Sequence, residues 1–175
     1  MRRLIVILVV LSLALVAAGC GSKSSSSSSS SQSTTATTAS TGKTHLAKTK
    51  FVVHAGLAFG AFHRYIYKPF KEGKFSGGLT HHKLAVVKAA AAAAFAYHET
   101  KLALKDARSS KVLSKALAPL LALQTKLGSL RDGLKHGKAD TSTIDAANGD
   151  TTAVNAAGSQ AGQPVHDLPT PQLGH

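Results

Sequence analysis

One run of apolar residues limits what this chain can fold into more than any other feature. From residue 112 to residue 134 the apolar residues recur at spacings of three and four, which puts them on one face of a helix. Pro119 predicts a kink or a restart in this helix, and Gly137 predicts its end. Because the pattern lacks complementary flanking charges, it fits an intramolecular bundle better than a coiled coil. The face consists of Val112, Ala116, Leu120, Leu123, Leu127, Leu130 and Leu134.

Other segments predict helices of the same kind. Residues 51–70 place most of the aromatic residues on one face, and Pro69 and Gly73 predict the end of that helix. Residues 80–107 carry two apolar stripes, which predicts neighbours on two or more sides. Residues 143–160 give a weaker pattern of small residues and leave open whether a fourth helix forms. The first stripe of residues 80–107 holds Leu84, Val87, Ala91, Phe95, His98 and Leu102, and the second holds Val86, Ala90, Ala93, Tyr97 and Leu104.

The composition agrees with helices and excludes a disulfide scaffold. Aromatic residues make up 5% of the 175 residues, tryptophan is absent, and the single cysteine cannot form an internal disulfide. A core rich in alanine suits closely packed helices better than sheets. We therefore expect an all-α fold, an antiparallel three- or four-helix bundle over residues 45–161. The proline-rich segment 162–175 is predicted to be a disordered tail.

The N-terminal residues have the pattern of an export signal. Two arginines follow Met1, an apolar run begins at Leu4, and three small residues precede Cys20. The run from Leu4 to Gly19 is 16 residues long. It is therefore shorter than the ~20 residues that a membrane-spanning helix needs.

A cysteine directly after Ala17-Ala18-Gly19 resembles the lipobox of bacterial lipoproteins. The resemblance implies that residues 1–19 are a cleaved signal peptide. It also implies that Cys20 is lipidated and holds the chain at the outer face of the cell membrane or at another envelope membrane. The residues alone also allow cleavage by an ordinary signal peptidase, or an uncleaved anchor. Residues 20–44 then form a disordered Ser/Thr-rich linker, because polar low-complexity sequence cannot bury apolar surface.

The positive charge is concentrated in the predicted bundle. The chain has a net charge of +13, and residues 43–138 hold 18 lysines and arginines but only four acids. Such a field attracts polyanions. We therefore expect a binding or structural module for an anionic envelope polymer, an anionic lipid or a protein partner. Nucleic acid is a weaker candidate, since stacking aromatics and base-reading motifs are missing, and we expect a monomer.

No group of residues predicts catalysis. The lipobox resemblance implies that Cys20 is lipidated and so not a nucleophile. The serines lie in the linker or at helix starts, and no nucleophile elbow or phosphate-binding loop is present. We therefore expect no enzyme activity, no cofactor and no metal site. The alternative function is a lipoprotein that binds a small ligand, haem or a metal through histidines on its helices, above all His54 and His98. We favour partly buried histidines with hydrogen-bond partners. His45, His54 and His63 recur every nine residues, so successive members face opposite sides of a helix and cannot chelate together.

Two glycines in the first predicted helix require an explanation. Gly56 and Gly60 lie on one side of it, and each costs about 1 kcal/mol relative to alanine. We expect a neighbour that approaches the bare backbone there, namely the alanine run at residues 89–94. A ligand packed against the backbone is the alternative.

Overall fold

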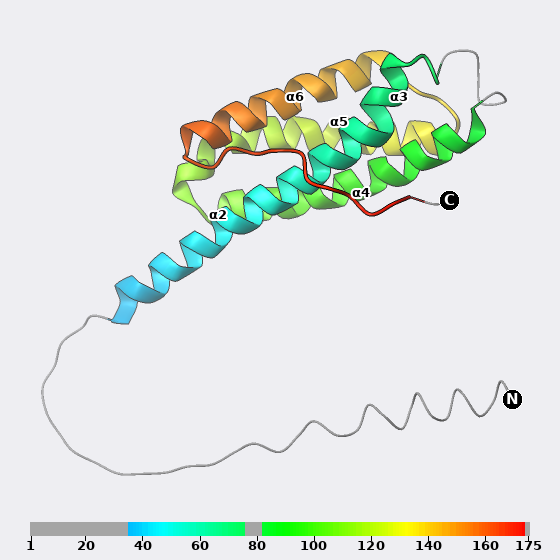
Figure 1. Cartoon of the computed structure of the whole chain (residues 1–175). Helices are drawn as coiled ribbons and strands as arrows, with labels where there is room; N and C mark the ends of the chain where they lie inside the picture. Colours follow the sequence, from blue (N-terminus) through cyan, green and yellow to red (C-terminus); the bar gives the residue numbers. More distant parts are fainter. Residues whose placement is uncertain (1–34, 76–81, 174–175) are drawn as a thin grey trace, which may run out of the picture. The chain divides into compact units, whose positions relative to one another are not determined.

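The structure is a computed structural model that describes residues 35–75 and 82–173, with side chains from residue 45 onward. The predicted signal peptide, Cys20 and the linker up to residue 34 lie outside the described residues. Four long helices pack against one another, which confirms the predicted all-α bundle and shows that the fourth helix forms (Figure 1). No strand occurs within the described ranges. The helices are α2 (Thr35–Phe62), α4 (Lys83–Arg108), α5 (Leu117–Lys135) and α6 (Thr141–Gln160).

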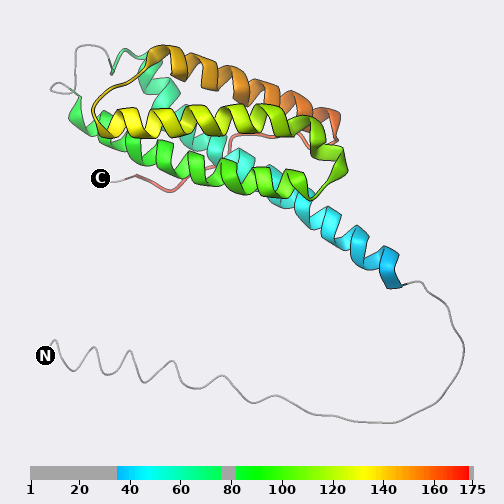
Figure 2. The same cartoon turned by 180° about the vertical axis from the view of Figure 1, so that it is seen from behind.

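Consecutive helices run in opposite directions, as Figures 1 and 2 both show. The main contacts join α2 to α4, α4 to α5, and α5 to α6. This order leaves a seam between the first and last helices, α2 and α6, which the C-terminal segment covers.

Helix α2 is longer than the sequence predicts. It begins at Thr35, so the prediction of a disordered linker is wrong for residues 35–44. Adding a residue to an existing helix costs far less than starting one, and the buried face from Phe51 onward provides that start. The predicted aromatic face is confirmed, since Phe51, Phe59, Phe62 and Ile66 are all buried.

The end of α2 is irregular. A π-helical segment, His63–Tyr67, follows it and leads into the short helix α3 (Lys68–Lys71). Proline inside a regular helix would clash with the carbonyl group four residues earlier, and the wider π turn ends at Tyr67, two residues before Pro69. The chain leaves the helix at Gly73, which has φ 72° as a left-handed terminus requires.

Most of the apolar residues that helix α4 buries are alanines, together with Val86 and Leu104 of the second predicted stripe. Ala89, Ala92, Ala93 and Ala96 are inaccessible to solvent. The prediction that the stripe containing His98 faces a neighbour is wrong for most of its residues, and Phe95 is the member that packs half-buried against the core. Leu84 and Val87 in that stripe are 63% and 64% exposed, and His98 is exposed as well. Small side chains allow neighbouring helices to approach closely, so the alanine face is the one that packs.

Helices α5 and α6 follow the sequence closely. Six of the seven predicted apolar positions before and along α5 are buried, and only Val112 is exposed. Pro119 marks a restart, because a 3₁₀ segment (Lys111–Ala116) precedes the helix and the proline falls in its first turn. Gly137 ends the helix with φ 74°. Asp140 caps α6 and accepts hydrogen bonds from the backbone N–H groups of residues 142 and 143.

The C-terminal tail, residues 163–173, lies against the bundle, so the prediction of disorder is wrong for these residues. Figure 1 shows it running along α2 on the side of α6. Val165 is 3% exposed, and its N–H group donates to the Asn155 side chain on α6 at 3.0 Å. The N–H group of Leu168 donates to the Gly56 carbonyl oxygen on α2, also at 3.0 Å. Prolines keep the segment out of a helix, and these two contacts attach it to both sides of the seam.

The tail, and not the alanine run, is the neighbour for which Gly56 and Gly60 leave room. A methyl group at Gly56 would lie 2.6 Å from the His166 carbonyl oxygen, and one at Gly60 would overlap the Leu168 carbonyl oxygen. The predicted close approach is therefore confirmed, but the expected partner is corrected.

Replacing Gly60 by alanine should lower the melting temperature, although alanine is the better helix former. Overlap with the tail backbone costs about 1–3 kcal/mol, against about 1 kcal/mol gained in helix propensity. Gly149 is a matched control, because nothing lies within 4 Å of a methyl group there. Gly149→Ala should raise the melting temperature by roughly 2–5 °C. Thermal unfolding followed by circular dichroism compares the two variants. A higher melting temperature for both Gly60→Ala and Gly149→Ala would show that the tail does not lie against Gly60.

Candidate functional site

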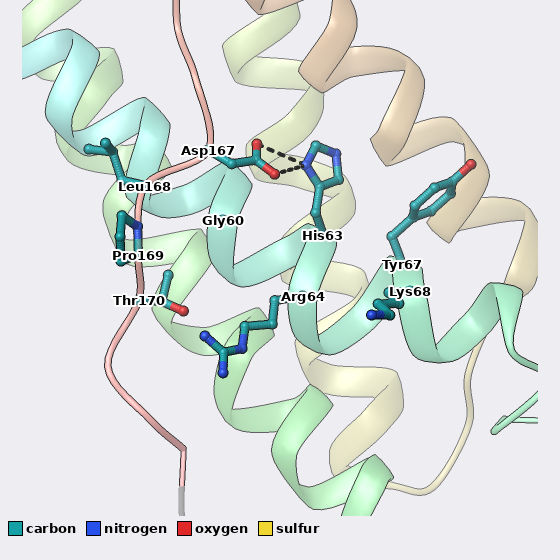
Figure 3. Close-up of a pocket in the computed structure, with 9 residues that line it drawn as sticks. All are labelled: Gly60, His63, Arg64, Tyr67, Lys68, Asp167, Leu168, Pro169 and Thr170. Atoms are coloured by element: carbon teal, nitrogen blue, oxygen red, sulfur yellow. Dashed lines mark hydrogen bonds and ion pairs between the residues drawn. The ribbon is translucent and has the colours of Figure 1, made fainter.

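The most developed site is a pocket between the end of α2 and the C-terminal tail (Figure 3). Its volume is about 480 Å³, within the range of small-molecule sites. We call it the tail pocket. One wall comes from the end of α2, the π-helical segment and α3, and the other from the tail. The lining residues are Gly60, His63, Arg64, Tyr67, Lys68, Asp167, Leu168, Pro169 and Thr170.

His63 joins the two walls. Its Nδ1 lies 2.8 Å and 2.9 Å from the two carboxylate oxygens of Asp167 on the tail. Because an ionised carboxylate only accepts hydrogen bonds, Nδ1 is the donor. On the other side of the ring, Nε2 lies 3.2 Å from the Asn148 side-chain oxygen and 3.4 Å from the Thr151 hydroxyl on α6. One imidazole therefore connects the π-helical segment, α6 and the tail.

A hydroxyl, an imidazole and a carboxylate, from Thr151, His63 and Asp167, follow one another as in a catalytic triad. The geometry does not allow the Thr151 hydroxyl to act as a nucleophile. Thr151 is 3% exposed, so a substrate carbonyl cannot reach its hydroxyl. That hydroxyl donates at 2.7 Å to the Asn148 carbonyl oxygen, and its contact with the ring is longer. A nucleophile must instead face the reacting atom and give its proton to the base.

Two cations stand at the mouth of the tail pocket. Arg64 and Lys68 are one helical turn apart and exposed, and neither forms an ion pair with a carboxylate of the described residues. Arg64 lies over the ring of Tyr65, 5.3 Å from its centroid, which limits the directions in which the guanidinium can point. The mouth of the pocket is therefore positively charged.

The hydroxyl of Thr170 has no hydrogen-bond partner among the described residues. Thr170 lies in the wall of the tail pocket and is 9% exposed. A buried hydroxyl without a partner costs about 1–3 kcal/mol, so the unpaired group needs a reason. Figure 3 shows it on the side of the tail that faces Arg64.

A second polar cluster lies between α2 and α4. His54 Nδ1 is 2.7 Å from a carboxylate oxygen of Glu99, and Nε2 is 3.8 Å from one of Asp106. The side chain of His54 is 25% exposed, that of Glu99 10% and that of Asp106 15%. Burial raises the pKa of Asp106 above its ordinary value, and the positive charges of His54, Lys50 and Lys105 oppose the shift.

The structure separates the two histidines of the alternative hypothesis. His54 meets Glu99 and Asp106, whereas His98 is exposed on α4. No three His, Cys, Asp or Glu side chains in the described part of the chain gather closely enough to hold a metal ion. His54 is thus the partly buried, hydrogen-bonded histidine that the sequence favoured.

The comparisons with known proteins return nothing. No protein family matches the chain, and neither does any curated protein or solved structure. Within the described ranges, no helix has both the length and the hydropathy needed to cross a membrane.

The sequence did not point to Asp167 or Thr170, because the tail was expected to be disordered, nor to Asn148, because residues 143–160 gave only a weak helical pattern. One signal was available: Val165, Leu168 and Leu173 supply apolar side chains within the proline-containing segment. Prolines exclude a helix there, but they do not prevent these side chains from packing against the bundle.

Replacing Asp106 by asparagine should stabilise the protein at pH 7. A raised pKa means that the folded state favours the protonated carboxyl, so ionised Asp106 destabilises the fold at neutral pH and the penalty disappears as the pH falls. The difference in melting temperature between Asp106→Asn and wild type should therefore be positive at pH 7 and shrink towards zero below about pH 3.9. The exposed Asp145 of α6 provides the control, and Asp145→Asn should have little effect. A lower melting temperature for Asp106→Asn at pH 7 would mean that its attraction to His54 outweighs its burial.

Proposed function

We propose that this chain is an extracytoplasmic lipoprotein, held by lipidated Cys20, whose basic helical bundle binds an anionic component of the cell envelope. The observation that carries the proposal is the lack of acidic partners for the bundle's positive charge. Among the described lysines and arginines only Lys74, Lys126 and Arg131 lie within 4.0 Å of a carboxylate. The remaining cations are available to an external anion.

Five exposed cations gather where α4 passes into the 3₁₀ segment. We call this group, Lys101, Lys105, Arg108, Lys111 and Lys115, the cationic end. Two of them, Lys105 and Arg108, lie in the last turn of α4, where a positive charge also stabilises the helix terminus. Lys115 lies in the last turn of the 3₁₀ segment and donates to the Gln160 side chain on α6 at 3.3 Å. Lys101 and Lys111 have no such role at a helix end, which supports binding to an external surface.

The cationic end is also where the chain enters the bundle. The approach of His54 to Asp106 shows that the early part of α2 packs beside the last turns of α4. The chain therefore enters the bundle at the cationic end. Each lysine or arginine near an anionic membrane contributes roughly 1 kcal/mol. Among the anionic envelope components, lipid headgroups fit this placement best.

Sedimentation with vesicles tests the proposal. Residues 21–175 contain the whole compact unit Thr34–His175 and should bind phosphatidylglycerol vesicles but not phosphatidylcholine vesicles. Changing Lys101, Lys111 and Lys115 to glutamine should weaken the partition coefficient on the order of 100-fold. The matched control replaces three exposed lysines at the other end of the bundle and should have a much smaller effect. The control lysines are Lys71, Lys83 and Lys135.

Two outcomes would contradict the proposal. Equal losses in the two triple variants would show that only net charge matters, and equal binding to both kinds of vesicle would remove the electrostatic argument. The anchor is tested separately in the expressing bacterium. A fatty-acid analogue should label the full chain and not its Cys20→Ala variant, and equal labelling of both would exclude lipidation at Cys20.

A further inference from the structure

We propose that the tail pocket is a binding site for a small molecule that carries a carboxylate or phosphate group on an apolar body. The site is distinct from the cationic end, since its lining comes from the later part of α2, the residues after it and the tail. The inference therefore does not rest on lipid anchoring or on membrane binding. It places the ligand site beside Gly60, where a ligand against the bare backbone was the alternative reading of the sequence, and away from His98.

The charge at the mouth selects an oxyanion. Arg64 offers a planar set of donors that matches carboxylate and phosphate oxygens, and Lys68 adds a second positive charge one turn away. The one carboxylate in the lining, Asp167, is held by His63 at 2.8 Å. Figure 3 shows that Asp167 points towards His63 and away from Arg64 and Lys68. Its charge is thus directed away from the group that the two cations would bind.

The hydroxyl of Thr170 supplies the second, independent observation. It is unpaired among the described residues and belongs to a side chain that is 9% exposed. It lies on the side of the tail that faces Arg64, so an oxyanion held by Arg64 would be placed to accept its proton. A hydrogen bond to a charged group is stronger than one to a neutral group. Binding an oxyanion would therefore remove the penalty of the unpaired hydroxyl.

The rest of the lining is suited to an apolar body. Leu168, Pro169 and the ring of Tyr67 form the walls. A pocket of about 480 Å³ holds a molecule of the size of a substituted aromatic acid. Inorganic phosphate alone would leave most of this apolar surface in contact with water, so it should bind more weakly than an organic phosphate.

Phenyl phosphate and benzoate are suitable probes, with benzyl alcohol as the uncharged control. In residues 21–175, an NMR titration with phenyl phosphate should shift the backbone amides of Arg64, Lys68 and Thr170 and reach saturation, and benzyl alcohol should not. Arg64→Gln should weaken binding about tenfold or more. Thr170→Val, which keeps the shape and removes the hydroxyl, should weaken it several-fold. Lys101→Gln on α4 carries the same change in charge as Arg64→Gln and should leave binding unchanged.

Three results would overturn the site. One is equal weakening by Arg64→Gln and Lys101→Gln, which would show non-specific attraction to a basic protein. Another is a set of shifted amides centred on the cationic end. The third is no saturable shift with either probe up to about 10 mM, a concentration above the range of useful small-ligand affinities. Circular dichroism of each variant shows whether it is folded, and the vesicle experiment is unaffected by these outcomes.

The source of the oxyanion is decided by competition. If phosphatidylglycerol vesicles displace phenyl phosphate from the tail pocket, a lipid headgroup is the natural ligand class. If they bind without displacing it, the ligand is a soluble molecule. Both results support an oxyanion site, and they differ only in where the ligand comes from.

Discussion

The contact on which the rest of this structure depends is that between the C-terminal tail and the bare backbone of α2. The main helix contacts join α2 to α4, α4 to α5 and α5 to α6. The seam between α2 and α6 must therefore be covered by a segment outside the four helices. The tail covers it by hydrogen-bonding to Gly56 on one side and to Asn155 on the other. A side chain at Gly60 would occupy the position of the tail backbone. The glycines are thus best explained by the segment that packs on them, and their helix-propensity cost is offset by that closure.

The tail pocket exists because of this closure. Without residues 167–170, His63 would lose its carboxylate partner and Arg64 and Lys68 would stand on an open helix surface. The two proposed binding regions therefore have different origins. The cationic end arises from exposed side chains on helices, and any bundle with this sequence pattern would present it. The tail pocket needs a chain segment brought back over 100 residues to the end of α2, as the contact between His63 and Asp167 shows.

Sequence alone predicts much of the bundle and little of the pocket, and the reason is physical. The leucines of α5 and the aromatic face of α2 are periodic, so their burial follows from helix geometry. The buried face of α4 is hard to predict because alanines lie on several of its faces. Which face is buried depends on how closely the neighbouring helices can approach. The glycine pair correctly indicated a close contact, but a missing side chain carries no information about which partner fills the space. The tail has no helical period, and prolines are as compatible with an ordered extended segment as with a disordered one.

Hydrogen exchange at the Leu168 amide tests the central claim most directly. This N–H group bonds to Gly56 across the seam at 3.0 Å, and it lies in a segment without helix or strand of its own. Its protection can therefore come only from packing against the bundle. In residues 21–175 at neutral pH, NMR should show that the Leu168 amide exchanges far more slowly than an unstructured amide of the same sequence. Exchange of Leu168 at the unstructured rate, with the amides of α2 and α6 still protected, would contradict the account.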